Sequence, residues 1–210
     1  MRVIKEHDER KKEILDTAEG LFRIKGYEKC TIMDIIKEIG IAKGTFYHYF
    51  KSKEEVLDAV VLRYADIVRN NAEEALQIEN IRPVEKLMRV FMAMQITNQI
   101  DKDLLDNMHN VENALLHQKV LNKLVTTMAP ILVKVIEEGI EKKVWSCKYP
   151  LEYMQIFLVA SLSLTDEGIF ELDTDSQMRV MAAMISMLEE MLNVPEDCFM
   201  KLFMENFVQI

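Results

Sequence analysis

The chain has 210 residues, 50% of them hydrophobic, which is enough apolar surface for a folded core and excludes a largely disordered chain. Its most apolar stretch, residues 153–165, falls short of the roughly 18 residues that a membrane-spanning helix needs, and charges near the start interrupt any signal-peptide core, so we expect a cytoplasmic protein with no membrane partner. The net charge of −9 is uneven: residues 1–53 (the head) hold 12 Lys and Arg against 9 Asp and Glu, whereas residues 54–210 (the body) hold 14 against 26.

Two helices are expected at the start of the head, because apolar residues recur there at helical spacing between start and stop signals. The first spans about 9–25 and ends at Gly26, which can adopt the left-handed conformation of a C-terminal cap. Thr31 is predicted to cap the second helix, with Asp34 near the positive end of the helix dipole. Gly40 ends this second helix.

The remaining expected elements are also helices, which predicts an all-α fold. A third helix covers 43–50, only two turns, and Ser52 with Glu55 is predicted to form the capping box of a fourth that runs to about 77. No later stretch alternates apolar and polar residues as a strand would. The further expected helices span about 84–99, 103–111, 113–142 with a kink at Pro130, 150–168, 175–192 and 195–207.

The second and third helices are joined by Gly40-Ile41-Ala42, a tight turn typical of a helix-turn-helix. In such a unit the first helix crosses the DNA backbone, and the second enters the major groove and presents its N-terminal residues to base edges. Phe46 and Phe50, four residues apart, would anchor the buried face of the short helix. Its other side chains would then be free for DNA, namely Lys43, Thr45, Tyr47 and His48.

Residues 26–35 and 40–53 read GYEKCTIMDI and GIAKGTFYHYFKSK, and this pair of segments resembles the DNA-binding domain of the TetR family of bacterial regulators. The close match covers roughly residues 9–58. The resemblance implies a helix-turn-helix DNA-binding domain at 1–53 and a helical ligand-binding and dimerisation domain at 54–210. It also implies a bacterial, cytoplasmic transcriptional regulator that lies on the nucleoid when bound to DNA. Repression is the usual mode of the family.

Carried over by position, the resemblance implies roles for nine side chains in DNA binding. Thr31 would bond a phosphate, Met33 would face the groove, and Lys43, Gly44 and Thr45 would read or approach base edges. The remaining contacts, to a thymine methyl group or to phosphates, would come from Tyr47, His48, Tyr49 and Lys53. The sequence departs from the family at two positions: Ala42 replaces a capping serine, and Ile36 replaces an alanine between the helices.

The last two long helices of the expected fold carry long apolar faces. In the TetR family these helices pair with those of a second subunit, and the resemblance implies a homodimer that reads an inverted repeat in double-stranded DNA. The methionine-rich stripe could instead line a promiscuous ligand site. The predicted interface residues are Met154, Leu158, Leu162, Met181, Met184, Met187, Leu188 and Met191.

A small, mostly hydrophobic effector is the expected ligand of the body, bound between its helices. The candidate lining residues are Phe91, Met94, Gln95, Met108, His109, Asn113, His117, Met128 and Phe157, with ordinary core or surface positions as the alternative for each. Effector binding would favour a conformation that moves the two heads out of register with the DNA.

Two other classes of protein are built from helical bundles of this kind. A helical-bundle metalloenzyme needs two Glu-x-x-His pairs, and this sequence has none, so we expect no enzymatic activity, no cofactor and no metal. The three separated cysteines form no close pair of the kind that zinc or redox motifs use. A helical dimeric scaffold or interaction protein without effector control is the alternative function, but it would leave the basic head unexplained.

Overall fold

In the computed structural model the chain is all helical over the residues that the structure describes, which are 2–94, 109, 111–166 and 169–201. Contacts divide the chain into two compact units. The first comprises residues 1–65 and 97–123, and the second comprises residues 66–96 and 124–210. No helix in these described ranges is long and apolar enough to span a membrane.

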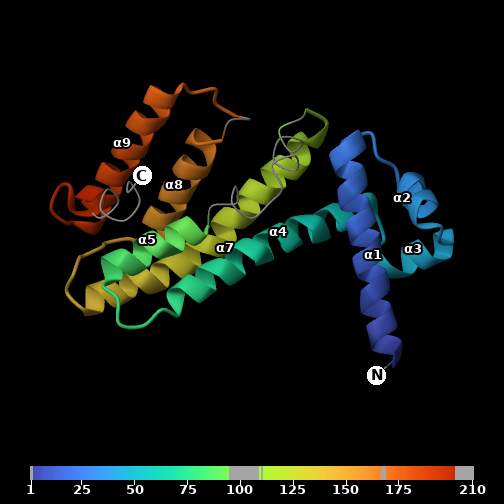
Figure 1. Cartoon of the computed structure of the whole chain (residues 1–210), viewed down its shortest axis with the longest axis horizontal. Coiled ribbons are helices and arrows are strands. Elements are labelled where there is room, and N and C mark those ends of the chain that lie inside the picture. The colour runs from blue at the N-terminus through green and yellow to red at the C-terminus, as the bar shows by residue number, and fades with distance from the viewer. Residues whose placement is uncertain (1, 95–108, 110, 167–168, 202–210) are drawn as a thin grey trace. The chain divides into compact units, whose positions relative to one another are not determined.

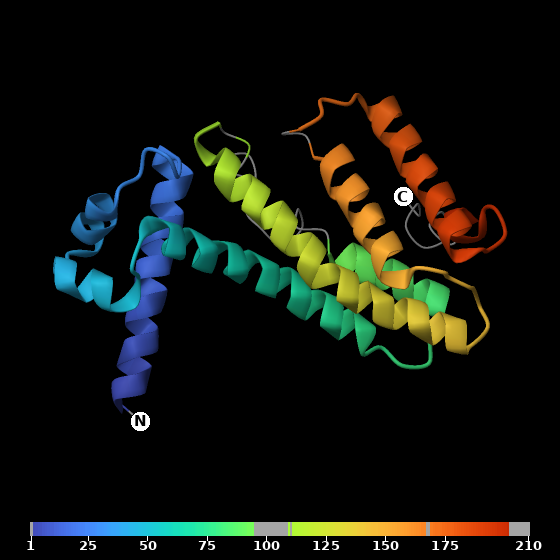
Figure 2. The ribbon, with the colours of Figure 1, turned by 180° about the vertical axis from the view of Figure 1, so that it is seen from behind.

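The first unit contains α1 (Arg2–Lys25), α2 (Ile32–Ile39), α3 (Lys43–Tyr49) and the first half of α4 (Lys53–Leu76), as Figures 1 and 2 show. The first helix therefore begins seven residues earlier than expected. The core of the first unit combines one face of α1 with α2, α3 and α4. It includes Ile14, Phe22, Ile35, Phe46 and Leu57, all at most 1% exposed. A short 3-10 turn, η2 (Val111–Asn113), leads into α7 (Ala114–Glu141), whose first ten residues also belong to this unit.

The second unit contains the remainder of α4 and α7 together with α5 (Pro83–Ala93), α8 (Pro150–Leu164) and α9 (Thr174–Leu192). The helices α8 and α9 lie side by side (Figures 1 and 2). Residues 198–201 are helical as well. Beyond Leu192 the chain is held by Glu189, a buried carboxylate that accepts hydrogen bonds from the backbone N–H groups of Asp197 (3.0 Å) and Phe199 (2.7 Å).

Most of the expected helices are confirmed, and two of them end earlier than expected. Pro130 lies inside α7, which is continuous from 114 to 141. The helix expected at 84–99 ends at Ala93, and the one expected at 150–168 ends at Leu164. Residues 95–108, 110, 167–168 and 202–210, which include most of the helix expected at 103–111, lie outside the described residues.

Candidate nucleic-acid interface

The start of α2 is fixed by the predicted capping residues. Thr31 has an extended backbone, its hydroxyl oxygen accepts a hydrogen bond from the Asp34 N–H (3.1 Å), and the Asp34 carboxylate accepts one from the Thr31 N–H (2.9 Å). The Thr31 hydroxyl also donates to the Asp34 carboxylate (2.6 Å). These bonds, together with the Lys25 ammonium 3.0 Å away, hold the pKa of Asp34 well below its usual range. The exposed Thr31 hydroxyl is therefore already engaged, and a phosphate would share it with Asp34.

The turn between α2 and α3 has the geometry expected of a helix-turn-helix. Gly40 adopts the left-handed conformation (φ 77°), and its N–H and that of Ile41 both donate to the Ile36 carbonyl (3.0 and 3.2 Å). Ala42 occupies the N-cap of α3 with an extended backbone but makes no side-chain cap hydrogen bond. The missing cap inferred from the sequence is therefore confirmed.

Helix α3 has one buried face and one exposed face, as expected. Phe46 and Phe50 are 0% and 2% exposed, and their ring centroids lie 6.2 Å apart. On the other face Tyr47 is 44% exposed, and the Lys43 ammonium lies 5.8 Å from the Tyr47 ring centroid. Gly44 is exposed, and a methyl group built on it would meet nothing within 4 Å. Two aromatic anchors thus hold this short helix so that its outer side chains face solvent.

The nine predicted DNA-binding residues all lie in the first unit. Six of them are exposed: Thr31, Met33, Lys43, Gly44, Tyr47 and His48. Three are half-buried: Thr45, Tyr49 and Lys53. Their roles toward DNA stay predictions, because they depend on a bound duplex.

Lys53 has internal partners that the sequence did not indicate. Its ammonium donates hydrogen bonds to the carbonyls of Tyr27 (2.8 Å), Glu28 (3.3 Å) and Cys30 (3.0 Å). The same ammonium lies 4.2 Å from the Tyr27 ring centroid. Lys53 at the start of α4 therefore binds the carbonyl-rich turn between α1 and α2, whatever further contact it makes with phosphate.

Asn113 joins this same turn to the start of α7. Its side-chain oxygen accepts a hydrogen bond from the Tyr27 N–H (2.7 Å), and its amide nitrogen donates to the Phe22 carbonyl (3.2 Å). The preceding residue, Glu112, accepts a backbone hydrogen bond from Glu28 (3.1 Å) and pairs with Lys29 (2.6 Å). The 111–113 turn is thus fastened to the end of α1 by buried and exposed contacts.

Ion pairs link α4 to its neighbours within the first unit. Arg63 pairs with Asp16 (2.6 Å) and Glu19 (3.0 Å) of α1. Lys119 of α7 pairs with Asp58 (2.6 Å) and Glu54 (3.2 Å) of α4, which raises the Lys119 pKa. Pairs of this kind on a surface are individually weak, about 0–1 kcal/mol, so they orient α4 more than they stabilise it.

The candidate effector-binding residues fall into separate groups. In the second unit the Phe91 and Phe157 rings lie 5.1 Å apart, Met94 is half-buried, and Met128 is fully buried. His109, Asn113 and His117 belong to the first unit. Gln95 and Met108 lie outside the described residues. Within each unit, therefore, the structure brings together only some of the predicted set.

The candidate dimer residues of α8 and α9 are largely packed inside the second unit. Four are buried, namely Met154, Leu158, Met184 and Leu188, and four are half-buried, namely Leu162, Met181, Met187 and Met191. The same helices expose other large apolar side chains: Ile156 (53% exposed), Val159 (52%) and Met178 (60%). Helical spacing alone did not separate these two faces, because both are apolar.

Two sequence models of known families match the chain. That of the bacterial regulatory proteins of the tetR family matches residues 14–60, and that of the tetracyclin repressor-like C-terminal domain matches residues 95–190. The HTH-type transcriptional repressor KstR2 of Mycolicibacterium smegmatis is 34% identical over 84 residues, which is 40% of each chain. The regulator EthR of the same organism is 33% identical over 87 residues, also 40% of each chain. The chain thus spans less than half the length of these curated relatives.

A solved structure shares the fold over nearly the whole chain. The crystal structure of a TetR-family transcriptional regulator from Syntrophomonas wolfei superposes with a TM-score of 0.65 at 20% identity, covering 90% of this chain and 98% of that one. The order of elements is that of an N-terminal helix-turn-helix followed by a helical body. Because family models match both parts of the chain, it belongs to the TetR family of bacterial transcriptional regulators.

Proposed function

We propose that this protein is a ligand-responsive repressor that binds an inverted-repeat operator as a homodimer and is released by a small, mostly hydrophobic effector. The observation that carries the proposal is that Lys43 and Tyr47 of α3 are exposed, whereas Phe46 of α3 and Phe50 at its C-cap are buried. A helix held in this way can enter a major groove without rearrangement. Repression is favoured by the similarity to KstR2, which is a transcriptional repressor.

The charge distribution supports DNA as the partner. Binding to phosphates needs local positive charge, and the head carries 12 basic against 9 acidic residues although the whole chain has a net charge of −9. The acidic body would be repelled by DNA, so electrostatics favours an approach through the head. Lys43 supplies a donor for base acceptors, and exposed Gly44 allows the backbone to approach closely.

A homodimer is supported by apolar side chains that remain exposed on α8 and α9. Ile156 and Val159 lie three residues apart on α8, and Met178 lies on α9, each more than half exposed. Covering such side chains with a second copy would remove their apolar area from water. Two heads related by a two-fold axis would then read half-sites about one helical turn apart, roughly 34–36 Å.

The proposed effector site lies in the second unit around Phe91 and Phe157. Their rings are in contact, and Met94 and Met128 supply flexible, polarisable side chains that fit irregular apolar ligands. An effector would release DNA only if it bound the released conformation more tightly than the operator-bound one. Phe91→Ala, in this proposed site, should therefore weaken effector binding. It should not change operator affinity when no effector is present.

The first experiment is selection from random duplex DNA by the purified protein at fixed moderate salt, followed by sequencing. We expect an inverted repeat to be enriched, and we expect Lys43→Ala and Tyr47→Ala to lose the enrichment. Lys134→Ala, which removes an exposed lysine of α7 in the second unit, is the matched control and should keep it. Affinity for the selected site should fall steeply as salt rises. A folded dimer that enriches no sequence would instead favour a helical scaffold.

The homodimer has its own test by sedimentation at micromolar concentration. Ile156→Asp should convert the dimer to a monomer, because it places a charge in the proposed apolar interface. Leu62→Asp makes the same kind of change at another exposed position, on α4 (45% exposed), and should leave the dimer intact. A dimer that tolerates Ile156→Asp would require a different interface.

A further inference from the structure

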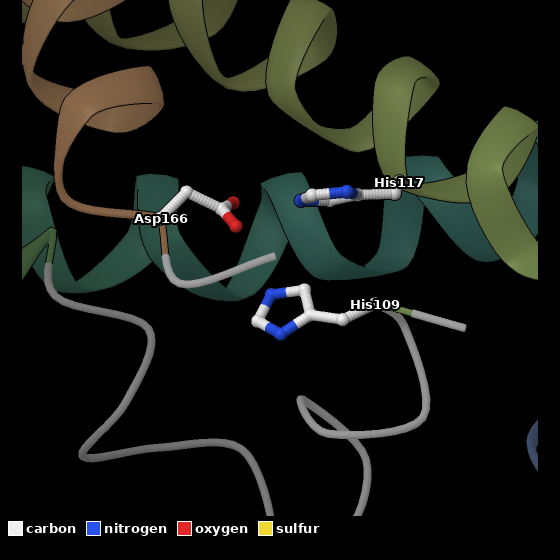
Figure 3. A group of neighbouring side chains, drawn as sticks. All are labelled: His109, His117 and Asp166. Carbon is white, nitrogen blue, oxygen red and sulfur yellow. The ribbon is translucent and has the colours of Figure 1, made fainter. Parts of the chain in front are cut away.

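Two histidines of the first unit, His109 and His117, bring their rings together (Figure 3). The ring centroids lie 5.1 Å apart with an interplanar angle of 57°, and a ring nitrogen of one lies within 4.8 Å of a ring nitrogen of the other. His117 is half-buried in the first turn of α7, and His109 precedes the 111–113 turn. The third side chain drawn in Figure 3, Asp166, belongs to the second unit.

The chemistry of this pair favours a transition-metal cation. Imidazole nitrogen is a preferred ligand of zinc, copper and nickel, whereas magnesium and calcium prefer oxygen. Two nitrogens bound to one tetrahedral zinc ion at about 2.0–2.1 Å lie about 3.3 Å apart. Because the two ring nitrogens already lie within 4.8 Å, a modest turn of the His109 ring would bring both to one ion.

The position of the pair gives such an ion a structural consequence. His109 and His117 lie on either side of the turn whose Asn113 bonds the Tyr27 N–H and the Phe22 carbonyl. An ion held by both rings would tie together the two ends of the segment that fastens α7 to α1. Any ligand that binds the folded state alone raises its stability. Occupancy should therefore raise the melting temperature of the protein.

We propose that His109 and His117 form a binding site for one first-row transition-metal cation, with one imidazole nitrogen from each as a protein ligand. Metal binding to histidine requires the neutral ring, because the proton and the metal compete for the same nitrogen lone pair. The site differs from the apolar effector site proposed around Phe91 and Phe157. It does not depend on the chain binding DNA, so the two proposals can fail separately.

The test uses the full chain, purified without a histidine tag and freed of metal. Addition of Cu²⁺ should give an electron paramagnetic resonance spectrum with coupling to two nitrogens at one equivalent. Calorimetric titration with Zn²⁺ should give one site per chain and a higher melting temperature, whereas Mg²⁺ should have no effect. His109→Asn and His117→Asn should each weaken Zn²⁺ binding at least tenfold, and each should reduce the copper spectrum to one coupled nitrogen.

The chain offers a matched control in its other two histidines. His7 and His48 also form a ring pair, 5.8 Å between centroids, but both are exposed on the head. The double variant His7→Asn/His48→Asn should bind Zn²⁺ as the unchanged chain does. Loss of binding in this variant alone, retained binding in His117→Asn, or no stoichiometric binding by the unchanged chain would each overturn the proposal. The nitrogen count from the unchanged chain tests it even if a variant misfolds.

Discussion

The side-chain oxygen of Asn113 accepts a hydrogen bond from the backbone N–H of Tyr27 at 2.7 Å, across 86 residues of sequence. The Asn113 amide also donates to the Phe22 carbonyl, and Asn113 is 1% exposed. Asn113→Ala should leave the buried Tyr27 N–H without this partner, whereas the Phe22 carbonyl still accepts from the Gly26 N–H (2.9 Å). The loss of the partner of the Tyr27 N–H should cost about 1–3 kcal/mol. Urea unfolding, monitored by circular dichroism, should show the decrease in the free energy of unfolding. Asn70→Ala, at an exposed position of α4, should change stability by less than about 0.5 kcal/mol.

Phe46 and Tyr47 are neighbours on α3 with opposite roles. Phe46 is 0% exposed and should cost about 3–5 kcal/mol of stability when changed to alanine, because the core of the head loses its ring and a cavity remains. Tyr47 is 44% exposed, so Tyr47→Ala should unfold at nearly the same urea concentration as the unchanged chain while losing operator affinity. Equal destabilisation by the two changes would contradict the assignment of one face to the core and the other to DNA.

The head was predictable from sequence because local interactions fix its elements. The Thr31 cap, the left-handed Gly26 and the end of the second helix at Gly40 involve groups within a few residues, and the structure confirms each of them. The capping box at Ser52 was only half correct. Ser52 accepts from the Glu55 N–H (3.1 Å), but the Glu55 carboxylate accepts from the Lys51 N–H (2.6 Å) rather than from that of Ser52.

The contacts between distant segments were not predictable in the same way. The sequence makes Asn113 either a candidate lining residue of an effector site or an ordinary core or surface position, and no local pattern indicates that it bonds backbone groups of residues 22 and 27. Lys53 was interpreted as a phosphate contact, yet three carbonyls of the α1–α2 turn surround its ammonium. Such partners depend on tertiary packing, and periodicity reports only which face of a helix is apolar.

Gly20 lies inside α1 and Gly26 follows its last residue, so substitutions at the two glycines form a matched pair. Gly26 has φ 79°, and a methyl group there would collide with the Cβ of Glu112, so Gly26→Ala should destabilise the protein by more than about 1 kcal/mol. Gly20 lies inside α1, and a methyl group there meets nothing within 4 Å. Gly20→Ala should therefore stabilise the protein by about 0.5–1 kcal/mol. Melting temperatures of the two variants should move in opposite directions, and a shared direction would be inconsistent with this backbone geometry.

Asp34 should make the stability of the head decrease as the pH falls into the acidic range. Hydrogen bonds from Thr31, then the Lys25 ammonium, hold its pKa in the folded state below that in the unfolded chain. A carboxylate with a lowered pKa contributes its full stabilisation above the unfolded value, near about 4, and loses it as the pH falls further. Asp34→Asn should therefore flatten the decline of melting temperature between about pH 5 and 2. Glu38→Gln, on an exposed position of the same helix, should leave that decline unchanged.

The N-terminus of α3 can be stabilised by restoring a cap. Ala42 has the extended backbone of an N-cap residue (φ −71°, ψ 147°), and its carbonyl accepts from the Thr45 N–H (2.9 Å), but it offers no side-chain oxygen to the first turn. Ala42→Ser would supply that oxygen without a change of backbone, and it should stabilise the head by about 0.5–2 kcal/mol. Ala183→Ser, at an exposed position inside α9, should instead reduce stability slightly, because serine is a poorer helix former than alanine. If Ala42→Ser fails to raise the melting temperature while Ala183→Ser behaves as expected, the first turn of α3 gains nothing from a side-chain cap beyond the hydrogen bond that the Ala42 carbonyl accepts from Thr45.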